Sequence, residues 1–411
     1  MKSSFDNLMQ EQGIDALWIT GAGDHNPDMV YFTGLHHISE AEVIKPRGGT
    51  AYLFHNPMER GEAAKTGLHT SSEEVSSYSY FLQKAGGDQL QARCLMVHAM
   101  LKRAGINKGR VVVSGLTDAG MVHSMLSALQ KLLPDYEFVG EIQENVIQLA
   151  RFSKDEEELE QIRKVGKLTV QVVAQTADLL SGMRSKNGEV VDGHGEPLTI
   201  GQVKRQIRLW LAERDLESPE EMILAQGRDA GIPHSAGNPQ DVIHTGVPIV
   251  FDIFPCQAGG GYYYDLTRTW CLGYAPDEVM RLYEDVRHVY QIILDEMRVG
   301  IPFKCYQERT CELFALQGHP TIQSDSKIEE GYVHSLGHGV GLNVHERPFS
   351  GMAASEQDIL HSGVVITVEP GLYYPSRMMG ARLEDTLYAT PQGEFKVMAD
   401  YPHDLVIPIR Q

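Results

Sequence analysis

A chain of 411 residues is too long for a single hydrophobic core, so we expect two domains. Hydrophobic residues make up 42% and charged residues 22% of the chain, a composition typical of soluble globular proteins. The formal net charge of −19 argues against nucleic acid and anionic membrane surfaces as partners, because binding to either depends on basic patches.

The sequence also limits the expected location of the protein and the roles that its cysteines can have. No apolar run is long enough to span a membrane, and the N-terminal stretch MKSSFDNLMQEQ lacks the apolar core of a secretory signal, so we expect a cytoplasmic protein. The cysteines are odd in number and form no CxxC pair, which argues against a disulfide framework and against a thiolate zinc site.

The N-terminal part of the chain alternates strand and helix signals. Apolar runs at 14–20, 50–55 and 110–115 are bounded by glycine or polar residues, as buried strands usually are. Residues 90–105 and 119–134 carry apolar residues at helical spacing. These signals predict a smaller α/β domain over residues 1–152, in which no residue pattern points to chemistry.

Helix-start signals follow this segment. Ser153 and Glu156 have the spacing of a capping box, which predicts a helix from this point. Thr199 and Gln202 predict a second helix in the same way, and a long amphipathic pattern after Pro276 predicts a third. We interpret all of them as helices that pack on the core.

The remaining apolar segments are rich in β-formers. They lie at 247–273 and at 364–390, on either side of a histidine- and glycine-rich run. Helices packed on one side of such an antiparallel sheet predict an α+β domain over residues 153–411.

Carboxylates interrupt these strand segments. Asp252 follows VPIVF, Asp265 follows YYY, Glu369 follows VVITV, and Glu384 lies within ARLEDTLYA. A charged carboxylate in an apolar strand costs several kcal/mol unless it is paired or binds a metal. Each could instead lie on the wet face of a sheet, but together they predict a common cationic partner.

The run YVHSLGHGVGLNVHERP supplies imidazoles. His334 and His338 have the spacing of a helical zinc motif, yet Gly337, Gly339 and Gly341 disfavour a helix. We expect these glycines to leave room for metal ions and a peptide beside the imidazoles, although His334 alone could be a core residue. Oxygen ligands with one imidazole suit a pair of ions such as Mn²⁺, Co²⁺, Fe²⁺ or Zn²⁺, which can polarise a carbonyl and generate hydroxide.

Several motifs carry a family resemblance. The segments HSLGHGVGLNVHE, PHSAGNPQDVIHTGVPIVFD, YDLTRT, ITVEPGLYY and GARLEDT resemble motifs of the pita-bread metallopeptidases, which include Xaa-Pro aminopeptidase, Xaa-Pro dipeptidase (prolidase) and methionine aminopeptidase. The resemblance covers residues 154–411. The preceding segment, with IDALWIT and YFTGL, is similar to the α/β domain of the proline-specific and creatinase branches. The resemblance implies helices packed on a curved antiparallel sheet and a homodimer or homotetramer.

Metal ligands follow from the resemblance position by position. It implies two divalent ions, Mn²⁺ before Co²⁺, Zn²⁺ or Fe²⁺, bridged by Asp265 and Glu384. The complete ligand set that it implies is Asp252, Asp265, His338, Glu369 and Glu384.

Catalytic and substrate-binding roles are implied in the same way. His234 and His345 resemble the family's histidines beside the scissile bond, and Arg382 resembles the arginine that orients the metal site. His334 would support the proline pocket. Arg347 in the HERP turn is a candidate clamp for a dipeptide carboxylate, with a solvated surface arginine as the alternative.

The implied activity is hydrolysis of the Xaa-Pro bond at the N-terminus of peptides or in dipeptides, by a hydroxide that bridges the two ions, with Glu369 shuttling the proton. The alternative is a creatinase-like amidinohydrolase or a lyase acting on a small zwitterion. One departure from the family is the interval 265 − 252 = 13, which is longer than usual and predicts an enlarged hairpin. Another is Phe254 in place of the family's glycine, which we expect to narrow the site.

Overall fold

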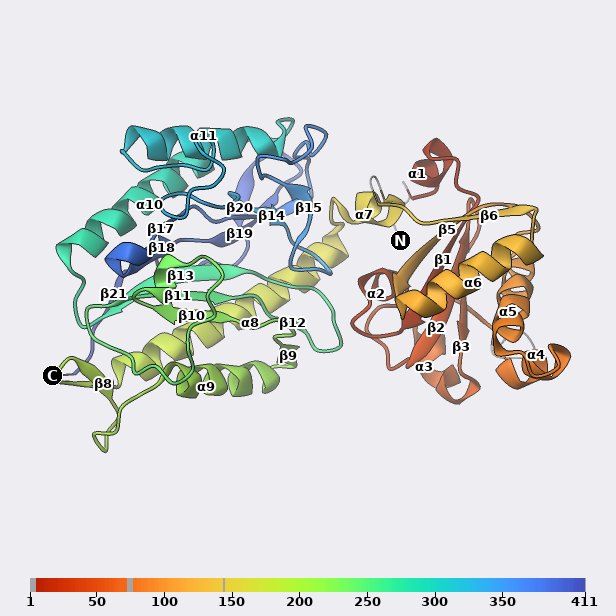
Figure 1. The fold of residues 1–411 in the computed structure, drawn as a ribbon, viewed down its shortest axis with the longest axis horizontal. Coiled ribbons are helices and arrows are strands. Elements are labelled where there is room, and N and C mark those ends of the chain that lie inside the picture. Colours follow the sequence, from red (N-terminus) through yellow and green to blue (C-terminus); the bar gives the residue numbers. More distant parts are fainter. Residues whose placement is uncertain (1–4, 72–76, 143–144, 411) are drawn as a thin grey trace. The chain divides into compact units, whose positions relative to one another are not determined.

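The computed structural model describes residues 5–71, 77–142 and 145–410, and its chain divides into compact units (Figure 1). The N-terminal unit comprises residues 1–151 with 259–261, and the C-terminal unit comprises residues 152–258 with 262–411. Within the part of the chain that the structure describes, every helix is too short or too polar to cross a lipid bilayer.

The N-terminal unit is a mixed β-sheet with helices on both faces, as Figure 1 shows. The strand order is β4-β3-β2-β1-β5-β6, in which β1 pairs antiparallel with β2 and parallel with β5. The strands are β1 Ala16–Ala22, β2 Glu40–Pro46, β3 Tyr52–His55, β4 His69–Ser71, β5 Gly109–Leu116 and β6 Tyr136–Val139. The helices are α1 Phe5–Glu11, α2 Pro27–Thr33, α3 Arg60–Lys65, α4 Tyr78–Lys84, α5 Gln89–Arg103, α6 Ala119–Leu132 and α7 Val146–Arg151.

The apolar runs predicted as strands correspond to β1, β3 and β5, and the helical patterns correspond to α5 and α6. Strand β2 was outside the prediction because Glu40, Glu42 and Lys45 interrupt its apolar run. It forms nevertheless, since β1 and β3 both pair with it and its alternate residues reach the apolar layers on either face.

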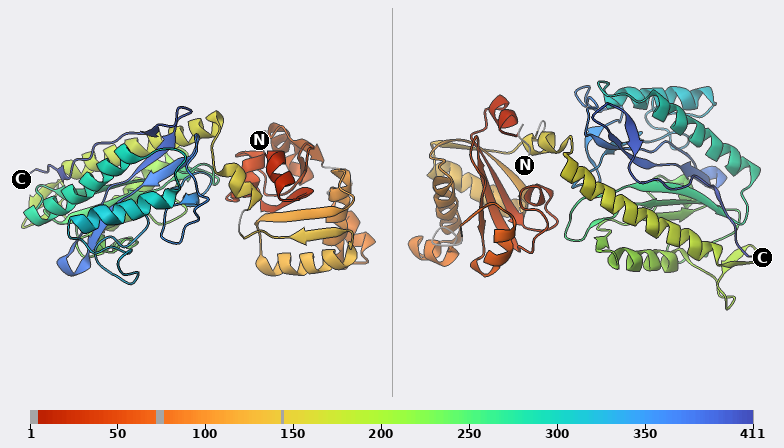
Figure 2. Two further views of the ribbon diagram at one scale, coloured as in Figure 1. Left: turned by 90° about the horizontal axis from the view of Figure 1, so that it is seen from above. Right: turned by 180° about the vertical axis from the view of Figure 1, so that it is seen from behind.

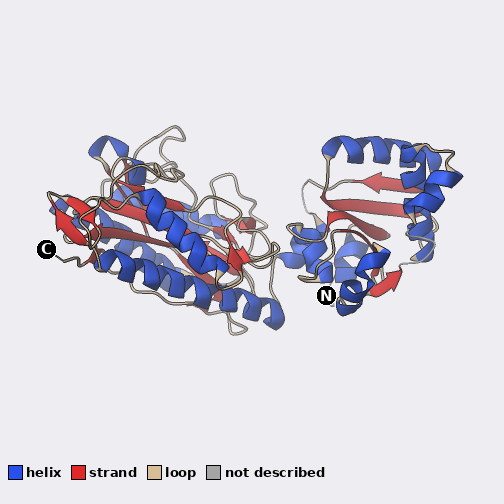
Figure 3. Ribbon diagram, turned by 90° about the horizontal axis from the view of Figure 1, so that it is seen from below, coloured by secondary structure: helices blue, strands red, loops and turns tan. Residues whose placement is uncertain are grey.

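In the C-terminal unit, helices cover separate sheets (Figures 2 and 3). Helices α8 Glu156–Ser181 and α9 Ile200–Ala212 share a core with the sheet β10-β11-β13-β21. Helices α10 Asp277–Glu296 and α11 Phe303–Leu316 share another with the sheet β15-β14-β16-β19-β20 and the hairpin β17-β18. The expected α+β architecture is therefore present, with the helices distributed over both halves.

The strands of this unit are mostly antiparallel, and β13 with β21 is a parallel pair. Their bounds are β7 Arg184–Lys186, β8 Glu189–Val191, β9 Leu216–Glu217, β10 Ile223–Gln226, β11 Pro248–Ile253, β12 Cys256–Gln257, β13 Leu266–Leu272, β14 His338–Gly339, β15 Glu346–Phe349, β16 Val365–Val368, β17 Gly371–Tyr374, β18 Met379–Arg382, β19 Asp385–Ala389, β20 Phe395–Val397 and β21 Val406–Ile407.

Helix α8 begins at a different cap from the one predicted. Asp155 is the N-cap, its side chain accepts from the backbone N–H of Glu158, and the Glu158 side chain accepts from the N–H of Asp155. The prediction of Ser153 with Glu156 is wrong because Ser153 forms a β-bridge with Val364, which keeps this residue extended. The capping box at Thr199 and Gln202 is confirmed.

Candidate metal centre

Strand register brings the predicted carboxylates together. In the pairing of β11 with β13, Asp252 lies opposite Thr267, and Thr267 in turn forms a β-bridge with Glu384. Thr267 therefore joins the sheet that carries Asp252 and Asp265 to the segment between β18 and β19 that carries Glu384. Asp252 lies within its strand, whereas Asp265 and Glu384 lie just outside strand ends, where side chains are freer to converge.

The remaining predicted ligands come from the second sheet. His338 lies in β14, which pairs with β16 through Gly339 and Ile366, and Glu369 directly follows β16. The Glu369 N–H also donates to the carbonyl of Leu336 across 2.8 Å, which ties the two segments together.

The ligand atoms are close enough to share a cation. One ligand atom each from Asp265, His338 and Glu384 lie within 4.8 Å of one another, and all these side chains are buried. His338 Nε2 is 3.7 Å from Asp265 Oδ2 and 3.4 Å from Glu369 Oε1. Asp252 is buried as well and lies near enough for its charge to raise the pKa of Asp265 and of Glu384.

The charge of Arg382 does not balance the buried carboxylates of this cluster. Burial, followed by mutual repulsion, raises the pKa of Asp265 and of Glu384 well above the ordinary range. Burial also raises the pKa of Glu369 to about 8, opposed by the charge of Arg382. Since isolated buried charges are unfavourable, these carboxylates ionise together only when further positive charge is bound.

Unpaired oxygens point to the same conclusion. Asp252 Oδ1 and Asp265 Oδ1 are buried, and neither has a hydrogen-bond partner among the described residues. Burial lowers the pKa of His338 to about 3, so its ring is neutral at ordinary pH. Its Nδ1 lies 3.1 Å from the carbonyl of Gly339, which assigns the proton to Nδ1 and leaves the Nε2 lone pair facing the carboxylates. The residues fit a divalent cation.

Arg382 holds the first aspartate in place. Its Nη2 donates to Asp252 Oδ2 across 2.6 Å, and both side chains are buried. Its Nε donates to Thr267 Oγ1 across 3.2 Å, and that hydroxyl donates to Glu384 Oε2 across 2.6 Å. The guanidinium therefore holds Asp252 directly and Glu384 through the hydroxyl of Thr267.

Buried threonines are site residues that the sequence analysis missed. The hydroxyl of Thr267 donates a hydrogen bond to Glu384. The hydroxyl of Thr367 accepts from the N–H of His338 and donates to Glu369. The hydroxyl of Thr386 accepts from the N–H of Asp265 and donates to its carbonyl. Each is fully buried. The signal available was their position inside YDLTRT, ITVEPG and LEDT, two residues from a carboxylate.

Tyr373 is another missed residue, and it connects His334 to Arg382. The Tyr373 hydroxyl accepts from Arg382 Nη1 across 3.0 Å and lies 2.8 Å from His334 Nε2. His334 Nδ1 lies 2.7 Å from the carbonyl of Ser335, so the proton belongs on Nδ1 and Tyr373 donates to Nε2. Burial lowers the pKa of His334 to about 3. With both ring nitrogens occupied, His334 is a supporting residue.

The histidines expected beside the substrate are exposed. The His345 ring centroid lies 4.2 Å from that of His338, and burial lowers the pKa of His345. His234 follows Pro233, whose carbonyl accepts from Arg382 Nη1 across 3.2 Å. Electrostatic coupling of His234 to both His334 and His345 places its ring near them.

Arg347 and Phe254 have other contacts than expected. The Arg347 Nε donates to Asp358 Oδ1 across 2.8 Å, its Nη2 pairs with the same oxygen, and Asp358 is buried. Arg347 is thus neither a solvated surface residue nor an unengaged clamp for a substrate carboxylate. Phe254 is partly buried and packs against the apolar core that α8 and α9 share with the sheet.

The glycines of the histidine run serve backbone packing. A Cβ atom on Gly337 would lie 2.1 Å from the carbonyl oxygen of Thr367, and one on Gly339 would lie 2.3 Å from that of Arg347. A Cβ atom on Gly341 would lie 2.2 Å from a carboxylate oxygen of Glu346. The expectation that these glycines leave room for ions and peptide is therefore wrong, since backbone carbonyls fill that room at Gly337 and Gly339 and the Glu346 side chain fills it at Gly341. A helix is absent over 332–348, as predicted.

The chain is similar to known proteins over nearly its whole length. The Xaa-Pro dipeptidase of Lactobacillus delbrueckii subsp. lactis is 26% identical over 416 residues, covering 98% of each chain. The uncharacterized peptidase YqhT of Bacillus subtilis (strain 168) is 24% identical over 403 residues, again covering 98% of each. The solved structure of an Xaa-Pro dipeptidase from Bacillus anthracis superposes with a TM-score of 0.76 at 20% identity, covering 98% of this chain and 97% of that one.

These similarities confirm the predicted architecture, a pita-bread domain preceded by a smaller α/β domain. The model of metallopeptidase family M24 matches residues 160–391, a segment that contains every predicted metal ligand. As this segment is more than half of the 411 residues, the chain belongs to metallopeptidase family M24.

Proposed function

We propose that this chain is a metal-dependent exopeptidase that hydrolyses the Xaa-Pro bond at the N-terminus of peptides or in dipeptides. The observation that carries the proposal is the convergence of Asp252, Asp265, Glu369 and Glu384 with neutral His338 around unpaired buried oxygens. The similarity to an Xaa-Pro dipeptidase over nearly the whole chain supports proline specificity. On this proposal, residues 1–152 form the N-terminal domain and residues 153–411 the catalytic domain.

The proposed ligand set, which would hold two divalent ions, is Asp252, Asp265, His338, Glu369 and Glu384. Two divalent ions are compatible with the charges of this set, since its carboxylates outnumber the guanidinium groups, that of Arg382, that contact them among the described residues. Divalent ions held by these residues would supply a nucleophilic hydroxide at neutral pH and an electrophile for the scissile carbonyl. We propose Mn²⁺ as the native ion, because the donors are mostly oxygen with one nitrogen.

The side chains would divide the remaining work. Glu369, whose raised pKa bound cations would bring down so that it is ionised, would accept the proton of the attacking water and pass it to the proline nitrogen as the C–N bond breaks. That proton is essential because the proline amide nitrogen carries none of its own. His234 and His345, both exposed beside the buried cluster, donate to the carbonyl oxygen as its negative charge develops. Arg382 keeps Asp252 in position.

Matched peptides test the proposal. The purified chain should cleave Ala-Pro or Ala-Pro-Ala in the presence of Mn²⁺ and should leave Ala-Ala and Pro-Ala largely uncut. EDTA should abolish this cleavage, and Mn²⁺ should restore it. Cleavage of Ala-Pro alone would make the chain a dipeptidase, whereas cleavage of the tripeptide would make it an aminopeptidase.

The result that would overturn the proposal is no cleavage of either proline peptide in the metal-loaded protein. Turnover of creatine or a similar small zwitterion that persists in EDTA would instead indicate the amidinohydrolase or lyase.

A further inference from the structure

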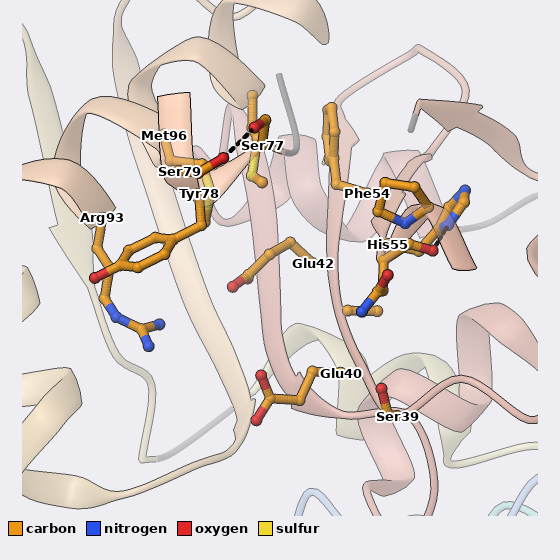
Figure 4. Close-up of a pocket in the computed structure, with 14 residues that line it drawn as sticks. Ser39, Glu40, Glu42, Phe54, His55, Ser77, Tyr78, Ser79, Arg93 and Met96 are labelled. Atoms are coloured by element: carbon orange, nitrogen blue, oxygen red, sulfur yellow. Dashed lines mark hydrogen bonds between the residues drawn. The ribbon is translucent and has the colours of Figure 1, made fainter. Parts of the chain in front are cut away.

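A cavity of about 560 Å³ lies in the N-terminal unit, whereas all the metal ligands belong to the C-terminal unit. Figure 4 shows Glu42 between Tyr78 and Arg93 on one side and Phe54 on the other. The cavity is bounded by β2 and β3 of the sheet and by helices α4 and α5. Its volume falls within the range of small-molecule sites.

Strand β2 directs a carboxylate into an otherwise apolar layer. Side chains alternate along a strand, so Glu42 shares its face with Ile44, which is fully buried together with Trp18 on β1. In the sheet register, Glu42 lies opposite Thr20 on β1 and opposite Phe54 on β3. An apolar residue would satisfy packing here, and a carboxylate costs free energy unless it is compensated.

Neighbouring donors hold the Glu42 carboxylate in a defined orientation. The indole Nε1 of Trp18 donates to Oε2 across 2.6 Å, and the hydroxyl of Thr20 donates to Oε1 across 3.0 Å. Each carboxylate oxygen retains a second lone pair. Partial burial raises the pKa of Glu42 to about 7, so the hydrogen bonds do not fully offset desolvation. Among the described residues, no cationic side chain directly contacts the Glu42 carboxylate.

Arg93, on the opposite wall of the cavity, carries a positive charge that complements the Glu42 carboxylate. Arg93, Met96 and Met100 lie on one face of α5, at positions i, i+3 and i+7, and all line the cavity. The Arg93 guanidinium lies over the Tyr78 ring, 5.6 Å from its centroid. It forms no hydrogen bond or ion pair with any residue that the structure describes, although its charge reaches Glu42. The cavity thus presents the carboxylates of Glu42, anchored by hydrogen bonds, and of Glu40, together with a guanidinium that has no ion pair among the described residues, and its walls carry both apolar and polar side chains.

We propose that this cavity binds a small zwitterion of the α-amino acid type with an apolar side chain. Its ammonium group would pair with Glu42, its carboxylate would pair with Arg93, and its side chain would lie against Phe54, Met96 and Met100. Charge-assisted hydrogen bonds at both ends explain why opposite charges face one cavity without pairing to each other.

Trp18 provides a direct probe, because its indole N–H bonds the proposed anchor. The chain contains three tryptophans, so ¹⁵N-tryptophan labelling gives three indole signals, which single Trp→Phe substitutions assign. L-Leucine added to the full-length chain should shift the Trp18 signal saturably, with a Kd at or below about 1 mM. The signals of Trp210 and Trp270 should stay in place, which separates this binding from binding at the metal centre.

Truncated ligands test the two-ended recognition. 3-Methylbutan-1-amine lacks the carboxylate of leucine and 4-methylpentanoate lacks its amine, so each should bind at least about tenfold more weakly than leucine. Equal binding of the amine would refute the role of Arg93, and equal binding of the acid would refute that of Glu42. No shift of Trp18 with leucine would overturn the proposal.

Variants locate the contacts. Glu42→Gln and Arg93→Met should each weaken leucine binding at least about tenfold. Arg103→Met, on the same helix but exposed and outside the cavity, should bind leucine as the unmodified chain does. Should Glu42→Gln disturb folding, seen as a loss of the Trp18 signal before ligand is added, Arg93→Met still decides the question. Unchanged binding in Arg93→Met would contradict the proposed site.

Discussion

Arg382 and Asp252 form a buried ion pair in which Nη2 lies 2.6 Å from Oδ2, while the other oxygen of the same aspartate has no hydrogen-bond partner among the described residues. One carboxylate oxygen thus fixes the position of Asp252, and the other is the one that would bind a cation in the proposed function. The ion pair therefore predicts the effect of substituting Arg382.

Arg382→Lys should lower metal affinity and kcat/KM by about 10- to 100-fold, because lysine keeps the charge but loses the fork that reaches both Asp252 and Thr267. Titration calorimetry with Mn²⁺ and peptide kinetics measure the two effects. Arg377→Lys is the matched control, since Arg377 is exposed and pairs with Glu278 outside the cluster. Unchanged Mn²⁺ affinity in Arg382→Lys would contradict the positioning role.

The metal-free protein should lose stability as pH rises from 6.5 to 8. The folded state raises the pKa of Asp265, Glu369 and Glu384, so it binds more protons than the unfolded chain in this window, and the free energy of unfolding falls with pH. His338 and His334, with pKa values lowered to about 3, act oppositely but only below their unfolded pKa of about 6.5.

We expect a loss of about 1 to 3 kcal/mol across this window, measured by urea unfolding in EDTA. Glu369→Gln should flatten the slope, because the amide does not titrate. Saturating Mn²⁺ should raise stability most at pH 8, where protons compete least for the ligands. A stability that rises with pH in the metal-free protein would show that the carboxylates are not coupled as described.

Tyr373→Phe should break the connection between Arg382 and His334. Its hydroxyl is fully buried and bonds both side chains, so its loss leaves polar groups unpaired and should cost about 1 to 3 kcal/mol of stability. We also expect a lower kcat/KM for proline peptides. Tyr374→Phe loses a hydrogen bond to His319 instead and should leave peptide kinetics unchanged. If Tyr373→Phe and Tyr374→Phe had the same kcat/KM for proline peptides, Tyr373 would have no role in catalysis.

Gly337→Ala should destabilise the protein by about 3 kcal/mol or more, because the added Cβ would lie 2.1 Å from the carbonyl oxygen of Thr367, a backbone atom that cannot move alone. The displaced strand carries His338, so Mn²⁺ affinity should fall as well. Gly351→Ala has its nearest neighbour at 3.6 Å and serves as the control. A stable, fully active Gly337→Ala would refute the close packing of this strand.

Arg347→Met should reduce stability by about 3 to 5 kcal/mol, since it leaves Asp358 buried and unpaired. The ratio of kcat/KM for Ala-Pro to that for Ala-Pro-Ala should stay the same. Arg309→Met, which breaks an exposed pair with Glu296, should cost less than about 1 kcal/mol. A selective loss of dipeptide cleavage in Arg347→Met would instead support the hypothesis that Arg347 binds the carboxylate of dipeptide substrates.

Residue type and local pattern were sufficient to predict many of the helices and strands of this protein and the carboxylates of its candidate site. Apolar runs located β1, β3 and β5, helical spacing located α5 and α6, and Thr199 with Gln202 marked the start of α9. The carboxylates at Asp252, Asp265, Glu369 and Glu384 stood out because a charge beside an apolar strand needs a reason. These are local signals, since each depends on residues within a few positions of one another.

Only the tertiary structure decided how distant segments meet. Strand register made Thr267 the neighbour of both Asp252 and Glu384. Packing of separate segments gave Arg347 its partner Asp358 and filled the space beside Gly337 with backbone. Strand pairing held β2 in its sheet despite its charges. Hydrogen bonds between strands depend on which residues lie opposite one another, and this is settled by packing across the whole domain, which no short window of sequence contains.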